Sequence, residues 1–388
     1  MAVPSLAMSP SDGAKAGKLY SVFPTDGTGD LDFTRASSAT RVNESGLIEL
    51  VATGFPRLDY TGGGCPSLLL EPSRTNYINK SNTFVDWNLG GVVSRTANYG
   101  ISPDGTLNST RADFANGGLI FKSVNRPTSA YVFSVFAKNT EGSGSQIALR
   151  IDLPTSKIGI FDLSNGTIVS TTADDSKIEY YGNGWYRCVI IQNNDSIVNA
   201  VITEGATELG CELFGAMLEE GSYATSYIPT AGTTVTRAVD ASTTTGISSV
   251  IGQTEGTIYS EFKLTEENIF TIIEINAANS TTNRILAYRN GSNIVFHVQV
   301  GNVLQIDNTT AFTFASINKV AVTYKANDFK IYANGSLLKA YTSGIIPSSL
   351  DTLAMLDINI SNKKHVIRSL ILYKTVLTDQ ELTALTTL

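Results

Sequence analysis

Aromatic residues with amide or guanidinium neighbours are the clearest chemical signal in the sequence. A protein holds a sugar by an aromatic ring against the C–H face of the pyranose and by polar side chains that hydrogen-bond its hydroxyl groups. Such residues occur in loop-like surroundings in "FVDWNLGG" and "TANYGISPDG", and near a hairpin tip in "NRILAYRNGS". Packing or a protein interface is the alternative role for each. The candidate sugar contacts are Trp87, Tyr99, Asn283, Arg284, Tyr288 and Arg289.

The sequence offers little that is suited to catalysis. His297 alternates with apolar residues in "NIVFHVQV" and His365 precedes the last apolar strand, so a structural or surface role is expected for both. No GxSxG, HExxH or Walker pattern occurs. A glycosidase needs only two carboxylates about 5 to 10 Å apart, and Glu261 and Glu274 lie in strand-like runs. We predict that the protein is not an enzyme, and glycosidase activity is the one catalytic class left open.

One acidic stretch raises the question of a metal ion. In "DGTGDLD", residues 26–32, oxygen ligands recur at alternate positions, as they do in calcium loops. The EF-hand pattern fails because Leu31 stands where glycine is required and Ser37 where the bidentate glutamate belongs. A solvated turn and no cofactor are therefore predicted, with calcium held by discontinuous loops as the weak alternative.

The cysteines and one tryptophan are assigned to structure. Cys65, Cys188 and Cys211 are widely spaced, odd in number and free of any CxxC pattern, so all three are predicted to be free thiols. Cys188 and Cys211 have apolar strand neighbours and are expected to be buried. Trp185 in "GNGWYRC" begins an alternating strand and is assigned to the core.

Composition and charge limit the classes of partner. The 388 residues carry a net charge of −7, which repels nucleic-acid phosphates, and no basic cluster appears. Charged residues make up only 16% of the chain, below the roughly 25% of average soluble domains. No run of about 18 apolar residues occurs, so no membrane insertion is predicted. The first residues lack the pattern of a signal peptide.

Turn signals and alternation predict an all-β protein. Five Asn-Gly pairs, the strongest short-range hairpin signal, begin at Asn116, Asn165, Asn183, Asn290 and Asn334. The stretch "YVFSVFAK" is apolar on both faces, as in a central strand covered by a second sheet. The one helix signal is "TDQELTALTTL", where Thr378 and Glu381 have the spacing of a capping box.

Composition suggests three segments. Residues 1–76 are rich in Gly, Pro, Ser and Asp and are predicted to form an extended N-terminal β-arm. Residues 77–240 and 241–388 each contain enough strands for one sandwich. The predicted fold is therefore two consecutive β-sandwich or jelly-roll domains, preceded by the arm and closed by one short C-terminal helix.

The phrase Thr-Arg-Ala occurs twice, at residues 34–36 and 236–238. Both copies lie near a predicted boundary, and Tyr227 and Ile228 just before the second are too apolar for a free linker. A guanidinium can bond several carbonyl oxygens at once. We therefore expect Arg35, Arg237, Tyr227 and Ile228 to make contacts between modules.

Three stretches carry a resemblance to known proteins. The runs "LDFTRASSATRVNESGLIELV" and "PRLDYTGGGCPSLLLEPSRTNYI" resemble the N-terminal module of many structural proteins of tailed bacteriophages and prophages. The region with "FDLSNGTIVS", "GNGWYRCVI" and "MLEEGSYATSYIPTAGTTVTRAVD" resembles the carbohydrate-binding-module-like jelly roll that accompanies it. The C-terminal region, ending in "VIRSLILYKTVLTDQELTALTT", is similar to concanavalin A-like (laminin-G-like) lectin domains.

The resemblance implies a virion protein, made in the host bacterial cytoplasm and exposed on the particle as a fibre, tail or head appendage. Its expected partners are other virion proteins, through the N-terminal module, and host-surface glycans. By analogy with phage fibres, a homotrimer is expected. A purely architectural or decoration protein of head, collar or tail, without a glycan ligand, is the alternative.

Overall fold

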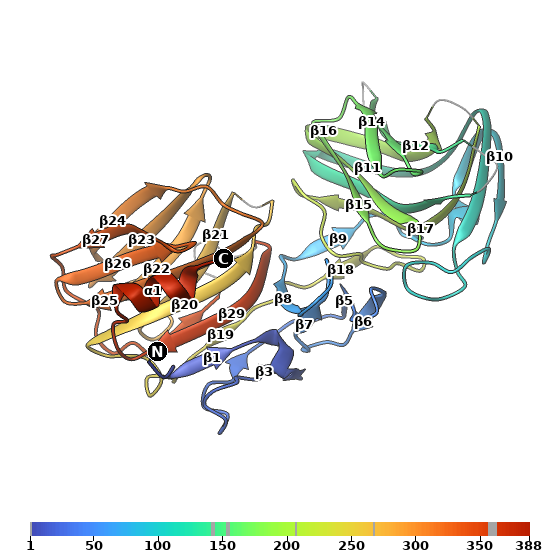
Figure 1. Ribbon diagram of the computed structural model, residues 1–388. Helices are drawn as coiled ribbons and strands as arrows, with labels where there is room; N and C mark the ends of the chain where they lie inside the picture. Colours follow the sequence, from blue (N-terminus) through green and yellow to red (C-terminus); the bar gives the residue numbers. More distant parts are fainter. Residues whose placement is uncertain (1, 141–143, 153–155, 206–207, 267, 356–362) are drawn as a thin grey trace. The chain divides into compact units, whose positions relative to one another are not determined.

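The computed structural model describes residues 2–140, 144–152, 156–205, 208–266, 268–355 and 363–388. The chain divides into two compact units. Unit 1 consists of Met1–Ser38, Val51–Ser73 and Ala238–Leu388, and unit 2 of Ala39–Leu50 and Arg74–Arg237. Almost all regular structure in the described residues is β, which confirms the predicted all-β class (Figure 1).

Unit 1 is a sandwich of two antiparallel sheets with, in its described residues, eight and six strands. The first sheet has the order β27 (Ser336–Tyr341), β26 (Asp328–Ala333), β25 (Ile317–Lys325), β20 (Glu255–Lys263), β29 (His365–Tyr373), β8 (Ser67–Leu70) and β7 (Arg57–Asp59), with β1 (Leu6–Met8) paired to β29. The second has the order β19 (Thr243–Thr244), β28 (Thr352–Ala354), β21 (Ile269–Asn276), β22 (Arg284–Asn290), β23 (Asn293–Val300) and β24 (Val303–Ala311). The strands β2 (Ala14–Lys15), β3 (Lys18–Leu19) and β4 (Leu31–Asp32) form a small separate sheet.

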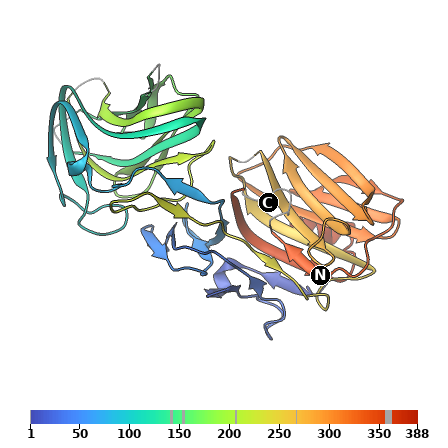
Figure 2. The ribbon, with the colours of Figure 1, turned by 180° about the vertical axis from the view of Figure 1, so that it is seen from behind.

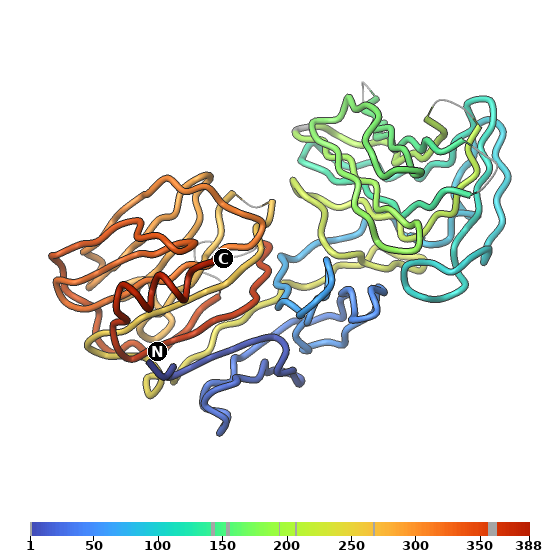
Figure 3. Tube along the Cα trace, in the orientation of Figure 1, coloured from blue at the N-terminus to red at the C-terminus, as the bar shows by residue number. Residues whose placement is uncertain are grey.

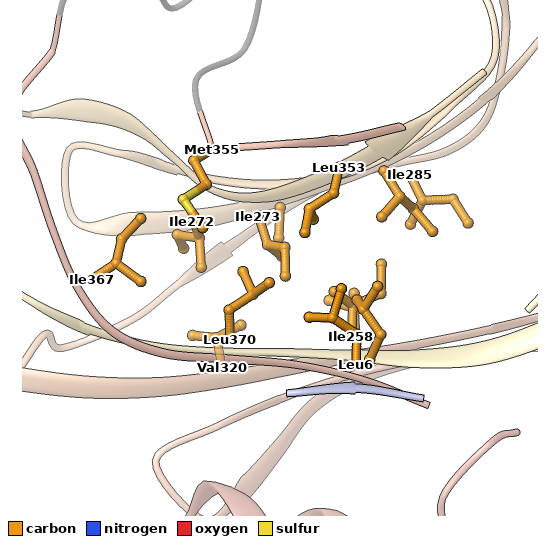
Figure 4. Packing of buried hydrophobic residues seen from close by; sticks show 14 of the residues in the cluster. Leu6, Ile258, Ile272, Ile273, Ile285, Val320, Leu353, Met355, Ile367 and Leu370 are labelled. Carbon is orange, nitrogen blue, oxygen red and sulfur yellow. The ribbon is translucent and has the colours of Figure 1, made fainter. Parts of the chain in front are cut away.

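The core of unit 1 lies between these sheets. Figure 4 shows Ile273, Ile285 and Leu353 of the six-stranded sheet pointing toward Val320 and Leu370 of the eight-stranded sheet. Each of these side chains is at most 1% exposed. Because side chains alternate along a strand, the sequence neighbours of these residues point to the outer faces of the sandwich. Strand β21 departs from this pattern, since the irregularity between Thr271 and Ile273 leaves both Ile272 and Ile273 in the core.

The predicted C-terminal helix is confirmed as α1 (Asp379–Thr386). The Thr378 hydroxyl accepts from the Glu381 backbone N–H, and the Glu381 carboxylate accepts from the Thr378 N–H, which is a complete capping box. Leu382 packs with Tyr259 and Tyr373 on the outer face of the eight-stranded sheet. The chain from the N-terminus to the helix at the C-terminus can be followed in Figure 3.

Unit 2 is a second sandwich built around two long, bent strands. Its main sheet has the order β10 (Asn88–Thr96), β11 (Thr110–Asn139), β16 (Trp185–Glu204), β12 (Gln146–Asp152), β13 (Lys157–Asp162) and β14 (Thr167–Thr171), with β15 (Asp175–Tyr180) paired to β16 and β17 (Leu209–Glu220) to β11. A hairpin of β5 (Ala39–Val42) and β6 (Ile48–Val51) and a pair of β9 (Arg74–Asn76) with β18 (Val235–Arg237) complete it. Figure 2 shows the strands from behind.

Most hairpin and core predictions are confirmed. Turns at Asn165, Asn290 and Asn334 join paired strands, and Asn183 lies between the paired strands β15 and β16. Asn116 differs, because it lies within β11, where the register of the pairing with β10 shifts, and joins no hairpin. Trp185, Cys188 and Cys211 are buried as expected, and the central strand "YVFSVFAK" pairs on both edges, with β16 and β17.

The N-terminal segment differs from the predicted arm. Its strands β1, β7 and β8 belong to the eight-stranded sheet of unit 1, whereas residues 39–50 and 74–76 belong to unit 2. Leu6, Leu68 and Leu70 are at most 1% exposed within the core of unit 1. Short apolar runs of the N-terminal segment therefore supply strands to a sheet whose other strands come from residues 255–373.

Candidate functional site

Trp87 is not available to a ligand, contrary to the sequence prediction. Its side chain is 3% exposed and packs on Phe84, with ring centroids 5.1 Å apart. The indole N–H donates to the Lys80 carbonyl oxygen at 3.0 Å. The residue follows a short 3-10 helix, Phe84–Asp86, which turns both rings into the core of unit 2. The flanking Gly and Asn residues suggested a loop, but they begin strand β10.

Tyr99 is exposed, and it belongs to a polar cluster of unit 2. The residue is 46% exposed, and its hydroxyl accepts a hydrogen bond from Arg111 Nη1 at 3.1 Å. The Arg111 guanidinium lies 5.3 Å from the ring centroid and also binds Asp113, with Nη2 2.7 Å from Oδ1. The hydrogen bond from Arg111 is the main reason why the pKa of Asp113 lies below its usual value. We call Tyr99, Arg111 and Asp113 the Tyr99 cluster.

The four candidates in "NRILAYRNGS" do not form one group. The Asn283 side-chain oxygen accepts from the Gly301 N–H at 2.9 Å, which ties one loop to another. Arg289 donates to the carbonyl oxygens of Gly291, at 2.8 Å, and Thr265, at 3.1 Å. Its guanidinium lies 4.9 Å from the ring centroid of Phe314. Burial lowers the pKa of Arg289, and these contacts give it a structural role.

Arg284 and Tyr288 do share one face. Ile285 and Ala287, between them on β22, belong to the core, so alternation places Arg284 and Tyr288 on the outer face of the six-stranded sheet. Arg284 Nε lies 3.4 Å from Gln299 Oε1, and Arg284 Nη1 lies 3.9 Å from Glu274 Oε1. The guanidinium therefore lies between a side chain of β21 and one of β23.

The neighbouring strands add residues that the sequence did not single out. The rings of Tyr288 and His297 meet edge to face, with centroids 5.3 Å apart and an interplanar angle of 75°. His297 Nε2 lies 2.7 Å from Asp307 Oδ1. Asn276 Nδ2 donates to Glu274 Oε1 at 3.1 Å. We call this set the Tyr288 face; its members are Glu274, Asn276, Arg284, Tyr288, His297, Gln299 and Asp307.

The Tyr288 face has a buried floor and a more exposed rim. Glu274 and Asn276 are 0% exposed, and Asn276 Oδ1 has no hydrogen-bond partner among the described residues. The side chain of His297 is 17% exposed and that of Asp307 is 60% exposed. Alternation in "NIVFHVQV" could have placed His297 and Gln299 together. Their pairing with β22 and β24 depends on the register, which the sequence does not reveal.

The carboxylates named as glycosidase candidates do not meet. Glu261 lies on the outer face of the eight-stranded sheet, where Arg368 Nε donates to it at 2.7 Å. Glu274 lies on the outer face of the six-stranded sheet, so the hydrophobic core separates the two. A glycosidase needs its carboxyl pair within about 10 Å across one glycosidic bond, which this arrangement does not provide. The described residues contain no group of three or more His, Cys, Asp or Glu that could hold a metal ion.

Each copy of Thr-Arg-Ala has partners in its own unit. Arg35, in unit 1, donates to backbone carbonyls of residues 37, 52 and 55 and to Asp240. Arg237, in unit 2, donates to the hydroxyls of Thr225 and Ser226. Tyr227 and Ile228 pack in unit 2 with Trp185. A role for these residues between modules stays a prediction.

Comparisons with known proteins return distant structural likenesses. No protein-family model and no curated protein matches the chain. Among solved structures, the CBM40 module of the Ruminococcus gnavus IT-sialidase has 18% sequence identity, a TM-score of 0.32, and coverage of 37% of this chain and 88% of that one. The same module bound to alpha2,3 sialyllactose has 20% identity, a TM-score of 0.31 and coverage of 37% and 87%.

A toxin domain shows a likeness of the same size. The binding domain of botulinum neurotoxin DC in complex with rat synaptotagmin II has 19% identity, a TM-score of 0.31 and coverage of 38% of this chain and 39% of that one. These values assign neither a family nor a ligand to this chain. Within the described residues, no helix has the length and apolar character needed to span a membrane.

Proposed function

We propose that the protein is a non-catalytic glycan-binding protein and that the Tyr288 face of unit 1 is its binding surface. One observation carries the proposal: Tyr288 lies beside His297 on a sheet face that also holds Arg284, Gln299 and Asp307. An aromatic ring with hydrogen-bonding groups beside it is the combination that sugar recognition requires.

The sheet gives this arrangement its rigidity. Binding groups on strands are held more precisely than groups on loops, and all seven members of the Tyr288 face lie on β21 to β24. Ion pairs and hydrogen bonds between neighbouring strands fix the side chains further. A ligand therefore meets groups that are already ordered, which lowers the entropic cost of binding.

We extend the proposal to the place of action from the sequence resemblance alone. The "FTRASSAT" run supports a tailed-phage virion protein, attached through its N-terminal residues to other virion proteins and exposed on the particle. A homotrimer would multiply the copies of the Tyr288 face. Many copies on one particle turn weak single-site binding into useful avidity. Mass measurement of the purified protein tests the trimer, and a monomer at all concentrations would contradict it.

A glycan array with the full chain tests the proposed binding, with and without calcium. Tyr288→Ala should abolish the signal, because the ring is lost, and Tyr288→Phe should keep most of it. Tyr99→Ala is the matched control, an exposed tyrosine in unit 2. Loss of binding in Tyr99→Ala alone would move the site to the Tyr99 cluster. A blank array with folded protein would favour the architectural role.

A further inference from the structure

The charges of the Tyr288 face are arranged in pairs. Arg284 lies between the carboxylate of Glu274 and the amide oxygen of Gln299, at 3.9 and 3.4 Å. His297 faces the carboxylate of Asp307 at 2.7 Å. Each cationic or potentially cationic group of the face is thus already engaged by an acceptor from a neighbouring strand.

The balance of charge on this face is negative or zero. Two carboxylates, Glu274 and Asp307, stand against one permanent cation, Arg284, and His297 carries charge only when it is protonated. The carboxylate most open to an incoming ligand is that of Asp307, whose side chain is 60% exposed. An anionic group of a ligand that reached the rim would approach the Asp307 carboxylate first.

An acidic ligand would also disturb the floor. To bind Arg284, a ligand carboxylate or sulfate would have to compete with Glu274, which is 0% exposed. Leaving a buried carboxylate without its cationic partner strongly destabilises the folded protein. Like charges placed together across an interface also weaken binding. A neutral sugar avoids both costs, because its hydroxyls can donate to Asp307 while its C–H face rests on Tyr288.

We propose that the Tyr288 face selects neutral sugars and rejects acidic ones, such as sialic acids, uronic acids and sulfated sugars. This inference rests on the proposed function and names the ligand class of the same site. The recognised unit is a neutral pyranose whose hydroxyls act as hydrogen-bond donors toward the rim.

The test uses the full chain and an array of matched glycans, each printed with and without a terminal sialic acid or sulfate. The neutral member of each pair should bind at least about tenfold more tightly, since a like-charge contact costs more than one tenfold step in affinity. Asp307→Asn should raise binding of the acidic members several-fold and so narrow the difference in affinity between the neutral and the acidic members. Asp328→Asn, a change of the same kind on β26 of the other sheet, should leave it unchanged.

The outcomes separate this inference from the function on which it rests. Acidic members that bind as well as neutral ones, with a signal that Tyr288→Ala abolishes, would overturn the selection for neutral sugars and keep the glycan-binding function. Equal discrimination in Asp307→Asn and in the unchanged protein would overturn the role given to Asp307. No binding of either member would overturn the proposed function itself.

Discussion

Arg35 and Asp240 form an ion pair inside unit 1, with Nη1 and Oδ1 3.0 Å apart, although 205 residues separate them in sequence. Both side chains are fully buried. Arg57 binds the second oxygen of Asp240 and, at 2.7 Å, also binds Glu71. Two arginines and two carboxylates thus form one buried network with balanced formal charge.

The network joins the three sequence segments of unit 1, Met1–Ser38, Val51–Ser73 and Ala238–Leu388. Arg35 lies shortly before the first unit 2 segment, residues 39–50, and Glu71 lies shortly before the second, residues 74–237. Arg57 lies between these two unit 2 segments, and Asp240 follows the second. The backbones of Glu71 and Asp240 also pair, since the Asp240 N–H donates to the Glu71 carbonyl oxygen at 3.0 Å.

Asp240→Asn should destabilise unit 1 by about 3–5 kcal/mol, because two buried guanidinium groups would share one remaining carboxylate. Both tryptophans, Trp87 and Trp185, lie in unit 2, so their fluorescence reports that unit while calorimetry reports both. The unfolding transition of unit 1, which calorimetry detects and tryptophan fluorescence does not, should move to a lower temperature. Glu255→Gln is the control; it removes a surface ion pair with Lys325, in which the two side chains are 28% and 53% exposed, and should cost less than about 1 kcal/mol. Equal shifts for both variants would contradict the importance of burial.

Local patterns in the sequence predicted local structure well. The hairpins at Asn165 and Asn334, the buried Trp185 and the capping box at Thr378 all depend on residues close together in the chain. The network of Arg35, Asp240 and their partners depends instead on which distant segments pair, and no local period encodes that. For the same reason the N-terminal strands looked like an arm, although they complete a sheet whose other strands follow residue 254.

The candidate site shows the same division. Alternation along β22 is enough to put Arg284 and Tyr288 on one face and Arg289 on the other. Burial of Trp87 follows from a 3-10 turn that loop-like composition concealed. The contact between Tyr288 and His297 requires the register between β22 and β23, which becomes known only when the sheet is assembled.

A fragment of residues 241–388 should not fold alone. It lacks β1 and β8, which pair with β29, and β7, which pairs with β8. It also lacks all four residues of the buried network. The exposed edge and the missing core side chains should leave it aggregated or unfolded in gel filtration and circular dichroism.

A matched fragment tests the reason for that failure. It keeps residues 1–38, 51–73 and 238–388, joined by short Gly-Ser linkers in place of the unit 2 segments. The backbone pairing of Glu71 with Asp240 holds one pair of ends close together, and the Gly54 N–H donates to the Arg35 carbonyl oxygen near the other. This fragment should be folded and monodisperse. If residues 241–388 alone gave equally cooperative unfolding, the N-terminal strands would not be part of the folding unit.

Thr378→Ala should destabilise unit 1 by about 1 kcal/mol, the usual cost of losing an N-cap side chain. The helix α1 has only eight residues and depends on its cap and on docking through Leu382. Thr378→Ser keeps the hydroxyl and should retain most of the stability. Urea unfolding of the two variants measures the difference, and equal stabilities would show that the cap contributes little.

Acid should destabilise unit 1 through His365. The side chain is 3% exposed, and its ring centroid lies 5.3 Å from that of Phe270. Burial lowers its pKa from 6.5 to about 3, against a smaller opposing effect of a hydrogen bond with the Thr271 backbone. Among the described residues, its Nε2 has no hydrogen-bond partner. The folded protein therefore holds this histidine neutral, whereas the unfolded chain binds a proton below about pH 6.5.

The sign of the pH effect follows from this difference in proton binding. Between pH 6.5 and 3 the unfolded state binds more protons, so the free energy of unfolding falls as the pH falls. About 2 kcal/mol should be lost between pH 7 and pH 5 from this group alone. His365→Phe removes the titrating ring, so its free energy of unfolding, measured by urea titration at each pH, should fall less steeply over that range. An identical pH dependence in the variant would show that His365 is protonated in the folded protein without cost.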